Sequence, residues 1–450
     1  MNKLKLTALF LVTFVTLINL LQACGDKDEF PPTFDLIQTR IFNTSCAIPS
    51  CHQSTSDPTF PQHGLVLEAS VAYDNLVNAD PRNINANNDG LKLVSPFNPG
   101  KSLLYHKIVS INTEHMLHHT GDYGMTMPLG LDLLTEGQVE FIRKWIEAGA
   151  PRNKGVADLS LLDDDTPQPE NYEPLPMPAS GYRVDLEKFE IAPDFEREFF
   201  VYKKIGNTED IYVNRFEIKM RRNSHHFLIY DINDAAPGPP ELDRIRDIRN
   251  PNGSMNFSNM FHMLFHVYVA GSQTQYFDYQ FPEGVAFKMP ANAAYDFNSH
   301  YVNKRNVPIE GEVNVNLHTI PKEQVQKAAG TINWGNTNFS LPANRVTTIT
   351  KTYTVEKRTY IFSLTSHTHA LGEKFVIKIS GGNRDGEVVY TSTDWHHPPV
   401  VNYTTPIVLE PGQGLTSEIT YNNNTNRVVN FGLTSEDEMG IIFGYYYEEE

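Results

Sequence analysis

Six residues between positions 225 and 439 have side chains that could bind two metal ions with different preferences. They are five histidines and one methionine: His225, His226, His300, His367, His369 and Met439. Imidazole nitrogen binds copper in either oxidation state, whereas the soft thioether of methionine favours Cu(I). The set divides into an all-histidine group and a group of two histidines and the methionine. It therefore predicts two unequal redox sites in one chain.

Local spacing places the histidines of the second group on one face of a strand. His367 and His369 end the apolar segment 358–369, and alternate side chains of a strand point the same way. One ion could therefore contact both imidazole rings. Met439 stands just before the last apolar segment, residues 441–447, and could supply a third ligand.

The adjacent histidines of the first group need an irregular backbone. In a regular strand His225 and His226 would point to opposite faces of the sheet. Joint binding of one ion therefore requires a strand end, a twist or a bulge. With that distortion, His300 would complete an all-histidine site.

The elements that would position these residues are strands. After residue 180, short segments alternate apolar and polar side chains, and turn-forming clusters such as residues 381–383 separate them. This pattern is typical of antiparallel sandwiches. We expect two all-β, jelly-roll-like sandwich domains at 181–321 and 322–450, preceded by a Pro- and Asp-rich linker at 153–180 that is either loose or wrapped along the next domain.

A cysteine pair followed by a histidine predicts a covalently attached haem upstream of the linker. Cys46 and Cys51 could form the two thioethers, and His52 directly follows the second of them. The usual c-type motif has two residues between the cysteines, whereas this chain has four. A small disulfide or a metal clip is the alternative use of the two thiols.

The far end of this segment resembles the end of small bacterial cytochrome c domains. A Met-Pro loop at 124–130 precedes a predicted helix, which a Thr135/Gln138 capping box begins and the sequence WIEAGA (145–150) ends. The resemblance covers residues 34–152 and implies a small all-α haem domain with His52 as proximal ligand and Met127 as sixth ligand. The other candidates for the sixth position are Met125, His115, His118 and His119.

The first residues have the pattern of an export signal. Two lysines precede an apolar run from residue 6 to residue 21, and the tetrad LQAC at 21–24 resembles a bacterial lipobox. We expect residues 1–23 to be a lipoprotein signal peptide and Cys24 to be lipidated. The protein would then be anchored to a membrane of a Gram-negative bacterium, facing either the periplasm or the cell exterior.

Charge and cysteine content narrow the classes of function. The 450 residues carry a formal net charge of -17, which argues against a nucleic-acid partner because phosphate binding needs a basic surface. Only three cysteines are present. One lipid attachment and two haem thioethers would use all of them.

Four short motifs, in order, resemble the copper type II ascorbate-dependent monooxygenases. They are SHHFLIYD (224–231), SHY (299–301), HTHALG (367–372) and DEMG (437–440). The resemblance covers about residues 181–447. It implies that one copper ion transfers electrons and that the other activates O2 for hydroxylation of a substrate carbon, with ascorbate as the family's reductant. The implied ligands are His225, His226 and His300 for the electron-transfer copper, and His367, His369 and Met439 for the oxygen-activating copper.

Departures from the family pattern bear on the substrate. The peptide-hydroxylating members have an arginine two residues before the first histidine of HTH, where this chain has Thr365. The family commonly has cysteine where Gly440 stands. We therefore expect copper chemistry on a small organic substrate other than a glycine-extended peptide.

The sequence supports two hypotheses of different classes. The first is a dicopper monooxygenase that receives electrons from ascorbate, from another donor or through the fused haem. The second is a non-catalytic haem and copper redox or copper-binding surface lipoprotein. The other histidines have simpler interpretations: His262 and His266 in a buried or strand-like segment, His318 in solvent, and His396 and His397 in a surface loop.

Overall fold

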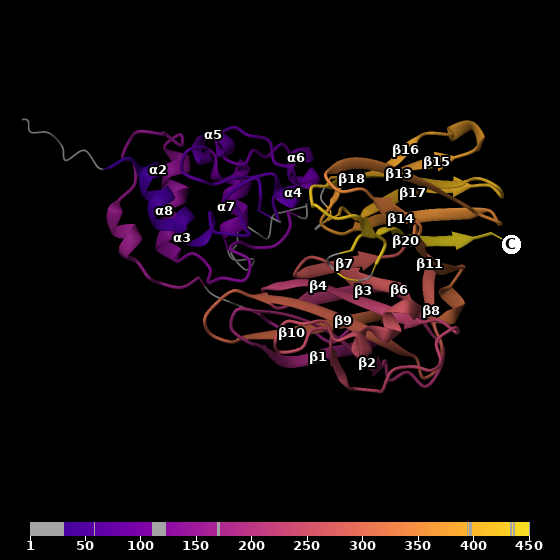
Figure 1. Ribbon diagram of the computed structural model, residues 1–450. Coiled ribbons are helices and arrows are strands. Elements are labelled where there is room, and N and C mark those ends of the chain that lie inside the picture. The colour runs from indigo at the N-terminus through magenta and orange to yellow at the C-terminus, as the bar shows by residue number, and fades with distance from the viewer. Residues whose placement is uncertain are drawn as a thin grey trace, which may run out of the picture.

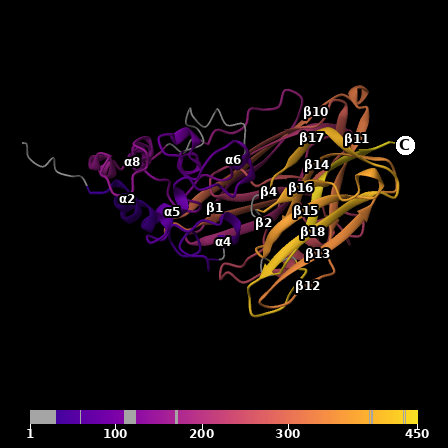
Figure 2. The same ribbon diagram turned by 90° about the horizontal axis from the view of Figure 1, so that it is seen from above.

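The computed structural model describes residues 31–57, 59–109, 123–168, 172–393, 395, 398–432, 434 and 437–449. It is mostly β, with antiparallel sheets and a smaller helical unit at one end of them, as two perpendicular views show (Figure 1) (Figure 2). The predicted signal peptide, Cys24 and the haem-ligand candidates His115, His118 and His119 lie outside the described residues, as do His396 and His397. Within those residues, no helix has the length and apolar character needed to cross a membrane.

The helical unit spans residues 33–163 and consists mainly of short helices. They are α2 (Thr33–Leu36), η1 (Ile37–Phe42), α3 (Asn43–Ser45), α4 (Phe60–His63), α5 (Ala72–Leu76), α6 (Ile84–Asn88), η2 (Pro99–Lys101), α7 (Leu103–Ile108), α8 (Glu136–Glu147) and η4 (Leu159–Asp163). The predicted capping box begins α8, because Gln138 N–H donates to Thr135 Oγ1 (3.2 Å) and Thr135 N–H donates to Gln138 Oε1 (3.0 Å). Trp145 of α8 is fully buried in the core of this unit.

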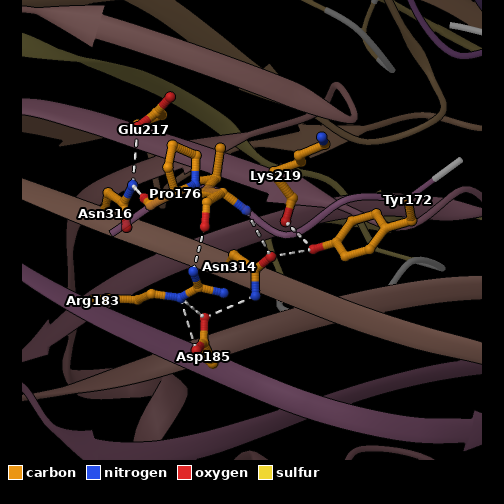
Figure 3. A network of polar contacts seen from close by, with 9 residues as sticks. Tyr172, Pro176, Arg183, Asp185, Glu217, Lys219, Asn314 and Asn316 are labelled. Carbon is orange, nitrogen blue, oxygen red and sulfur yellow. Dashed lines mark hydrogen bonds and ion pairs between the residues drawn. The ribbon is translucent and has the colours of Figure 1, made fainter. Parts of the chain in front are cut away.

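The expected linker is bound to the rest of the chain on both sides. Its first part packs on the helical unit, where the Gln168 side-chain amide donates to the carbonyl of Leu134 (2.8 Å). Its second part runs along the first sandwich, where Tyr172 Oη donates to Asn314 Oδ1 (2.7 Å) and Arg183 donates to the Leu175 carbonyl. Figure 3 shows the hydrogen bond between Tyr172 and Asn314 together with the Arg183–Asp185 ion pair. Residues 172–176 of the linker therefore lie along the first sandwich.

The first sandwich packs two sheets around one apolar core. One sheet has the order β5-β2-β9-β4-β6. Its strands are β2 (Phe195–Lys204), β4 (Ser224–Ile232), β5 (Ile245–Asp247), β6 (His266–Ser272) and β9 (Ala294–Asn303). The facing strands are β1 (Gly181–Ile191), β3 (Ile211–Met220), β7 (Tyr276–Gln280), β8 (Val285–Met289) and β10 (Ile309–Thr319), and the short helices α9 (Phe257–Met260) and η5 (Phe261–Phe265) precede β6.

The second sandwich has its own core but shares a sheet with the first. Its strands in the shared sheet are β11 (Lys327–Gly335), β14 (Thr359–Thr368), β17 (Val401–Leu409) and β20 (Gly440–Glu448). The opposite sheet has β13 (Arg345–Thr354), β15 (Gly372–Ser380), β16 (Val388–Ser392) and β18 (Gly414–Asn423), and β12 (Ser340–Leu341) pairs with β19 (Val429–Asn430). The one-turn helices are η6 (Lys322–Gln324) and η7 (Gly382–Arg384).

Parallel pairing of β8 with β11 joins one sheet of each sandwich into a single nine-stranded sheet. Aromatic side chains fill the junction, where the rings of Tyr268 and Phe443 lie 4.6 Å apart. A buried hydrogen bond also crosses it, because Tyr445 Oη donates to the Val269 carbonyl (2.7 Å). These contacts fix the position of one sandwich relative to the other, and therefore of the two histidine groups that they carry.

Candidate metal centres

A bulge brings the three histidines of the first group together. Strand β4 pairs with β9 so that His226 lies opposite His300, and the register shifts between Ser224 and His226. His225 occupies the extra position, which is the distortion that adjacent ligands require. One nitrogen from each of the three rings lies within 4.8 Å of the others.

Hydrogen bonds hold the outer edges of two rings and orient their inner nitrogens. His226 Nε2 lies 2.8 Å from Asn298 Oδ1, and His300 Nε2 lies 2.8 Å from Glu196 Oε1. The Nδ1 atoms of His225 and His226 are 3.1 Å apart. His300 Nδ1 is buried and has no hydrogen-bond partner, which is costly for a polar atom unless something binds it. The donor set fits a metal ion held through Nδ1, with Nε2 fixed by acceptors as metal-binding histidines usually are.

Two carboxylates on β2 surround this group with negative charge. Glu198 pairs with His300 in the sheet register, and Glu196 lies two residues earlier on the same strand. Burial alone would raise the pKa of Glu198, but His300, His226 and Asn298 lower it to about 2. Burial likewise disfavours the imidazolium form of His300, yet Glu198 and Glu196 raise its pKa. The two carboxylates therefore favour positive charge at the all-histidine group.

The second group forms at the end of β14. His367 lies in the strand and His369 lies just beyond it, with ring centroids 5.2 Å apart. Strand β20 pairs Gly440 with Thr368, so the backbone of Met439 comes beside His369. His369 Nδ1 lies 2.9 Å from the Asp437 carbonyl oxygen. This bond leaves Nε2 of His369 as its nitrogen for a metal ion.

A buried carboxylate fixes the segment that carries the methionine. Glu438 is fully buried and accepts three backbone N–H bonds, from Leu371 (2.7 Å), His369 (3.0 Å) and Met439 (3.2 Å). These bonds favour the charged form, but burial outweighs them and raises the pKa of Glu438 to about 7. One side chain thus ties the histidine loop to the methionine loop.

The two groups are close enough to interact electrostatically. Burial, together with the positive charges that His369 and His226 can carry, lowers the pKa of His367 to about 3. His226 belongs to the first group, so the two groups lie within electrostatic range of each other.

The predicted haem ligands are distributed between two loops of the helical unit. Cys46 and Cys51 are free thiols, and burial raises the pKa of Cys46 to about 12. His52 Nδ1 lies 3.1 Å from the Leu65 carbonyl oxygen, which leaves Nε2 for an axial bond. Met127 precedes a cis peptide bond to Pro128, and its N–H donates to the Lys107 carbonyl (2.6 Å). Two thiols, an oriented imidazole and a thioether form a donor set that fits haem c.

Sequence reasoning missed the residues that orient the ligands. Glu196 and Glu198 stand two positions apart on a strand, so they share a face, but nothing local links them to His300. His63 was also missed: its Nε2 lies 3.1 Å from the Cys51 carbonyl oxygen, and its ring is centred 3.9 Å from that of His52.

His262, His266 and His318 each lie close to an acidic side chain or a backbone carbonyl. His266 Nε2 lies 2.9 Å from Asp296 Oδ2, and His262 Nε2 lies 3.2 Å from the Gly238 carbonyl oxygen. His318, which we expected in solvent, has a side chain that is 19% exposed, and its Nε2 lies 3.0 Å from Glu217 Oε2. In the described part of the chain, the group on β4 and β9 is the one place where three or more His, Cys, Asp or Glu ligand atoms converge.

Comparisons with solved structures carry no argument about function. The chain is similar to the major capsid protein P2 of bacteriophage PM2 at 9% identity, a TM-score of 0.26, and coverage of 60% of this chain and 98% of that one. A match to PNGF-II has 9% identity, a TM-score of 0.19 and coverage of 67% and 71%. No curated protein matches the chain significantly.

The informative comparison is with protein families. Residues 318–450 match the family model described as copper type II ascorbate-dependent monooxygenase, C-terminal domain. The matched range contains His367, His369 and Met439, together with Glu438, which fixes their loops. This part of the chain is therefore similar to the C-terminal domain of the copper type II ascorbate-dependent monooxygenases.

Proposed function

We propose that the protein is a dicopper monooxygenase that uses O2 to hydroxylate a C–H bond of a small organic substrate. The observation that carries the proposal is the convergence of the three histidines of the first group, and the family match supports it. Three histidines converge with an unpartnered buried nitrogen on His300, and the family match covers the set that contains Met439. Copper storage alone would not need two such sets in separate sandwiches.

The two ligand sets would have different functions, electron transfer at one and oxygen activation at the other. Copper at His225, His226 and His300 would exchange single electrons, because imidazole serves both oxidation states. Copper at His367, His369 and Met439 would be kept reduced by the thioether and would supply oxygen activation. Glu196 and Asn298 orient the first set, and Glu438 orients the second.

The proposal also covers the electron donor, the cellular location of the protein and the class of its substrate. Cys46, Cys51, His52 and Met127 would hold a haem c that carries electrons in place of ascorbate or beside it. Residues 1–23 and the Cys24 lipid would export the protein and anchor it at a membrane. Thr365, which takes the place of the carboxylate-binding arginine, favours a substrate that lacks a peptide carboxylate.

Copper content and oxygen uptake test this proposal. We expect two copper ions per chain in the copper-loaded protein, one in His225→Ala and one in Met439→Ala. Both variants should lose substrate-dependent O2 uptake with ascorbate. Full copper loading without O2 uptake, with any reductant and across a broad substrate panel, would favour the non-catalytic surface lipoprotein instead.

A further inference from the structure

The loop that carries the expected sixth haem ligand is bonded to the turn that precedes the all-histidine group. Pro128 O, directly after Met127, accepts a hydrogen bond from Arg222 Nη2 (2.9 Å), and the same nitrogen donates to the Leu131 carbonyl. Gly130 N–H donates to Asn223 Oδ1 (3.1 Å) in a buried contact. The turn between β3 and β4, which directly precedes His225, thus both donates hydrogen bonds to this loop (from Arg222) and accepts one from it (at Asn223).

The same loop also reaches the strand end beyond the third histidine. Lys304 N–H donates to the Gly130 carbonyl (2.8 Å), and Arg305 forms an ion pair with Asp132 (2.8 Å). These residues follow β9, which carries His300.

Close packing makes the contact specific. Gly130 has a φ of +78°, and a Cβ there would lie 3.3 Å from the Val302 carbonyl oxygen and 3.2 Å from Lys304 Cγ. Asn223 is almost fully buried and has a φ of +69°. Backbone and side-chain hydrogen bonds hold this loop at several points, and a side chain at Gly130 would be tightly packed against Val302 and Lys304.

The contact forms a short bonded path between the two predicted redox centres. It runs from Met127 to the Pro128 carbonyl, across one hydrogen bond to Arg222, and along the chain through Asn223 and Ser224 to His225.

We propose that this contact, made by residues 128–132 with residues 222–223 and 304–305, is the electron-entry interface of the protein. It rests on the proposed haem and copper sites and adds the route between them. One electron leaves the ferrous haem and reduces Cu(II) to Cu(I) at the all-histidine group, and the haem becomes ferric. Arg222, Asn223 and Gly130 are positioning residues in this transfer, since they hold the loop and touch neither substrate nor O2.

Electron transfer is tested on the full-length protein with haem and copper contents measured first. The haem of the fully oxidised holoprotein is photoreduced without O2, and haem absorbance and the Cu(II) EPR signal are followed together. We expect first-order reoxidation of the haem at a rate independent of protein concentration, with loss of one Cu(II) signal. Gly130→Val and Arg222→Ala should each slow this step at least tenfold, while copper content, the Cu(II) spectrum and ascorbate-driven O2 uptake remain unchanged.

The control is Asp132→Asn, which removes only the ion pair at the edge of the contact. We expect its rate to stay within threefold of the wild-type rate, because the Asp132 side chain is 76% exposed and such pairs contribute little. Equal rates in wild type, Gly130→Val and Arg222→Ala would overturn the interface, as would a rate that rises with protein concentration. If Gly130→Val does not retain haem, Arg222→Ala makes the same comparison from the sandwich side. Ascorbate-driven O2 uptake with a ferrous haem that never reoxidises would reject the interface and leave the monooxygenase intact.

Discussion

Removing the carboxylate of Glu196 should weaken copper binding at the all-histidine group without unfolding the protein. Its Oε1 lies 2.8 Å from His300 Nε2, and its side chain is 45% exposed, whereas that of His300 is 9% exposed. The bond fixes the tautomer that presents His300 Nδ1 to the metal. Loss of such an outer partner typically reduces metal affinity about 10- to 100-fold, which corresponds to about 1.4–2.7 kcal/mol of binding free energy.

The affinity is measured by titrating Cu(II) against a competing chelator, followed by EPR. A His367→Ala background limits binding to the first group. Glu196→Ala should show the full loss, and Glu196→Gln a smaller one, because the amide oxygen still accepts a hydrogen bond. Glu310→Ala is the matched control, since Glu310 is an exposed glutamate paired with Lys188 on the same sandwich. An affinity for Glu196→Ala within twofold of that of the control would refute the assignment of Nδ1 as the His300 ligand atom.

Two further predictions concern the scaffold. Tyr445→Phe removes the buried bond to Val269 that crosses the sandwich junction and should lower the free energy of unfolding by about 1–3 kcal/mol in urea titrations; an unchanged midpoint would show that the bond contributes nothing. Burial raises the pKa of Glu217, but bonds from His318, Asn316 and Tyr276 outweigh it and hold that pKa below 4.5. Stability from this acid is therefore complete above pH 4.5 and is lost as the pH falls through its folded-state pKa. Glu217→Gln should reduce the loss of unfolding free energy at low pH. The same pH dependence of unfolding free energy in wild type and variant would contradict the claim.

The parts of the site that follow local rules could be predicted from the sequence. Strand alternation placed His367 and His369 on one face, and the adjacency of His225 and His226 required the bulge that β4 contains. The helix that carries Trp145 was predictable from its capping box. Each of these patterns involves residues within one helical turn or one strand, so it can be recognised locally in the sequence.

Long-range pairing left no local signal. Nothing near Val285 indicates that β8 pairs with β11 and so joins both sandwiches in one sheet. The carboxylate of Glu196 meets His300 only through the register of β2 with β9. The contact between Gly130 and Asn223 likewise joins segments far apart in sequence, so spacing could not reveal it.

Incorporation of oxygen from ¹⁸O2 tests the central claim most directly. The copper-loaded protein is incubated with ascorbate, ¹⁸O2 and an unbiased mixture of small organic compounds, and products are sought by mass spectrometry. We predict a product that gains one ¹⁸O atom with the wild-type protein and is absent with Met439→Ala, which retains the first copper. Labelled product at equal yield from Met439→Ala, or none from a wild-type protein that holds both copper ions, would contradict the account.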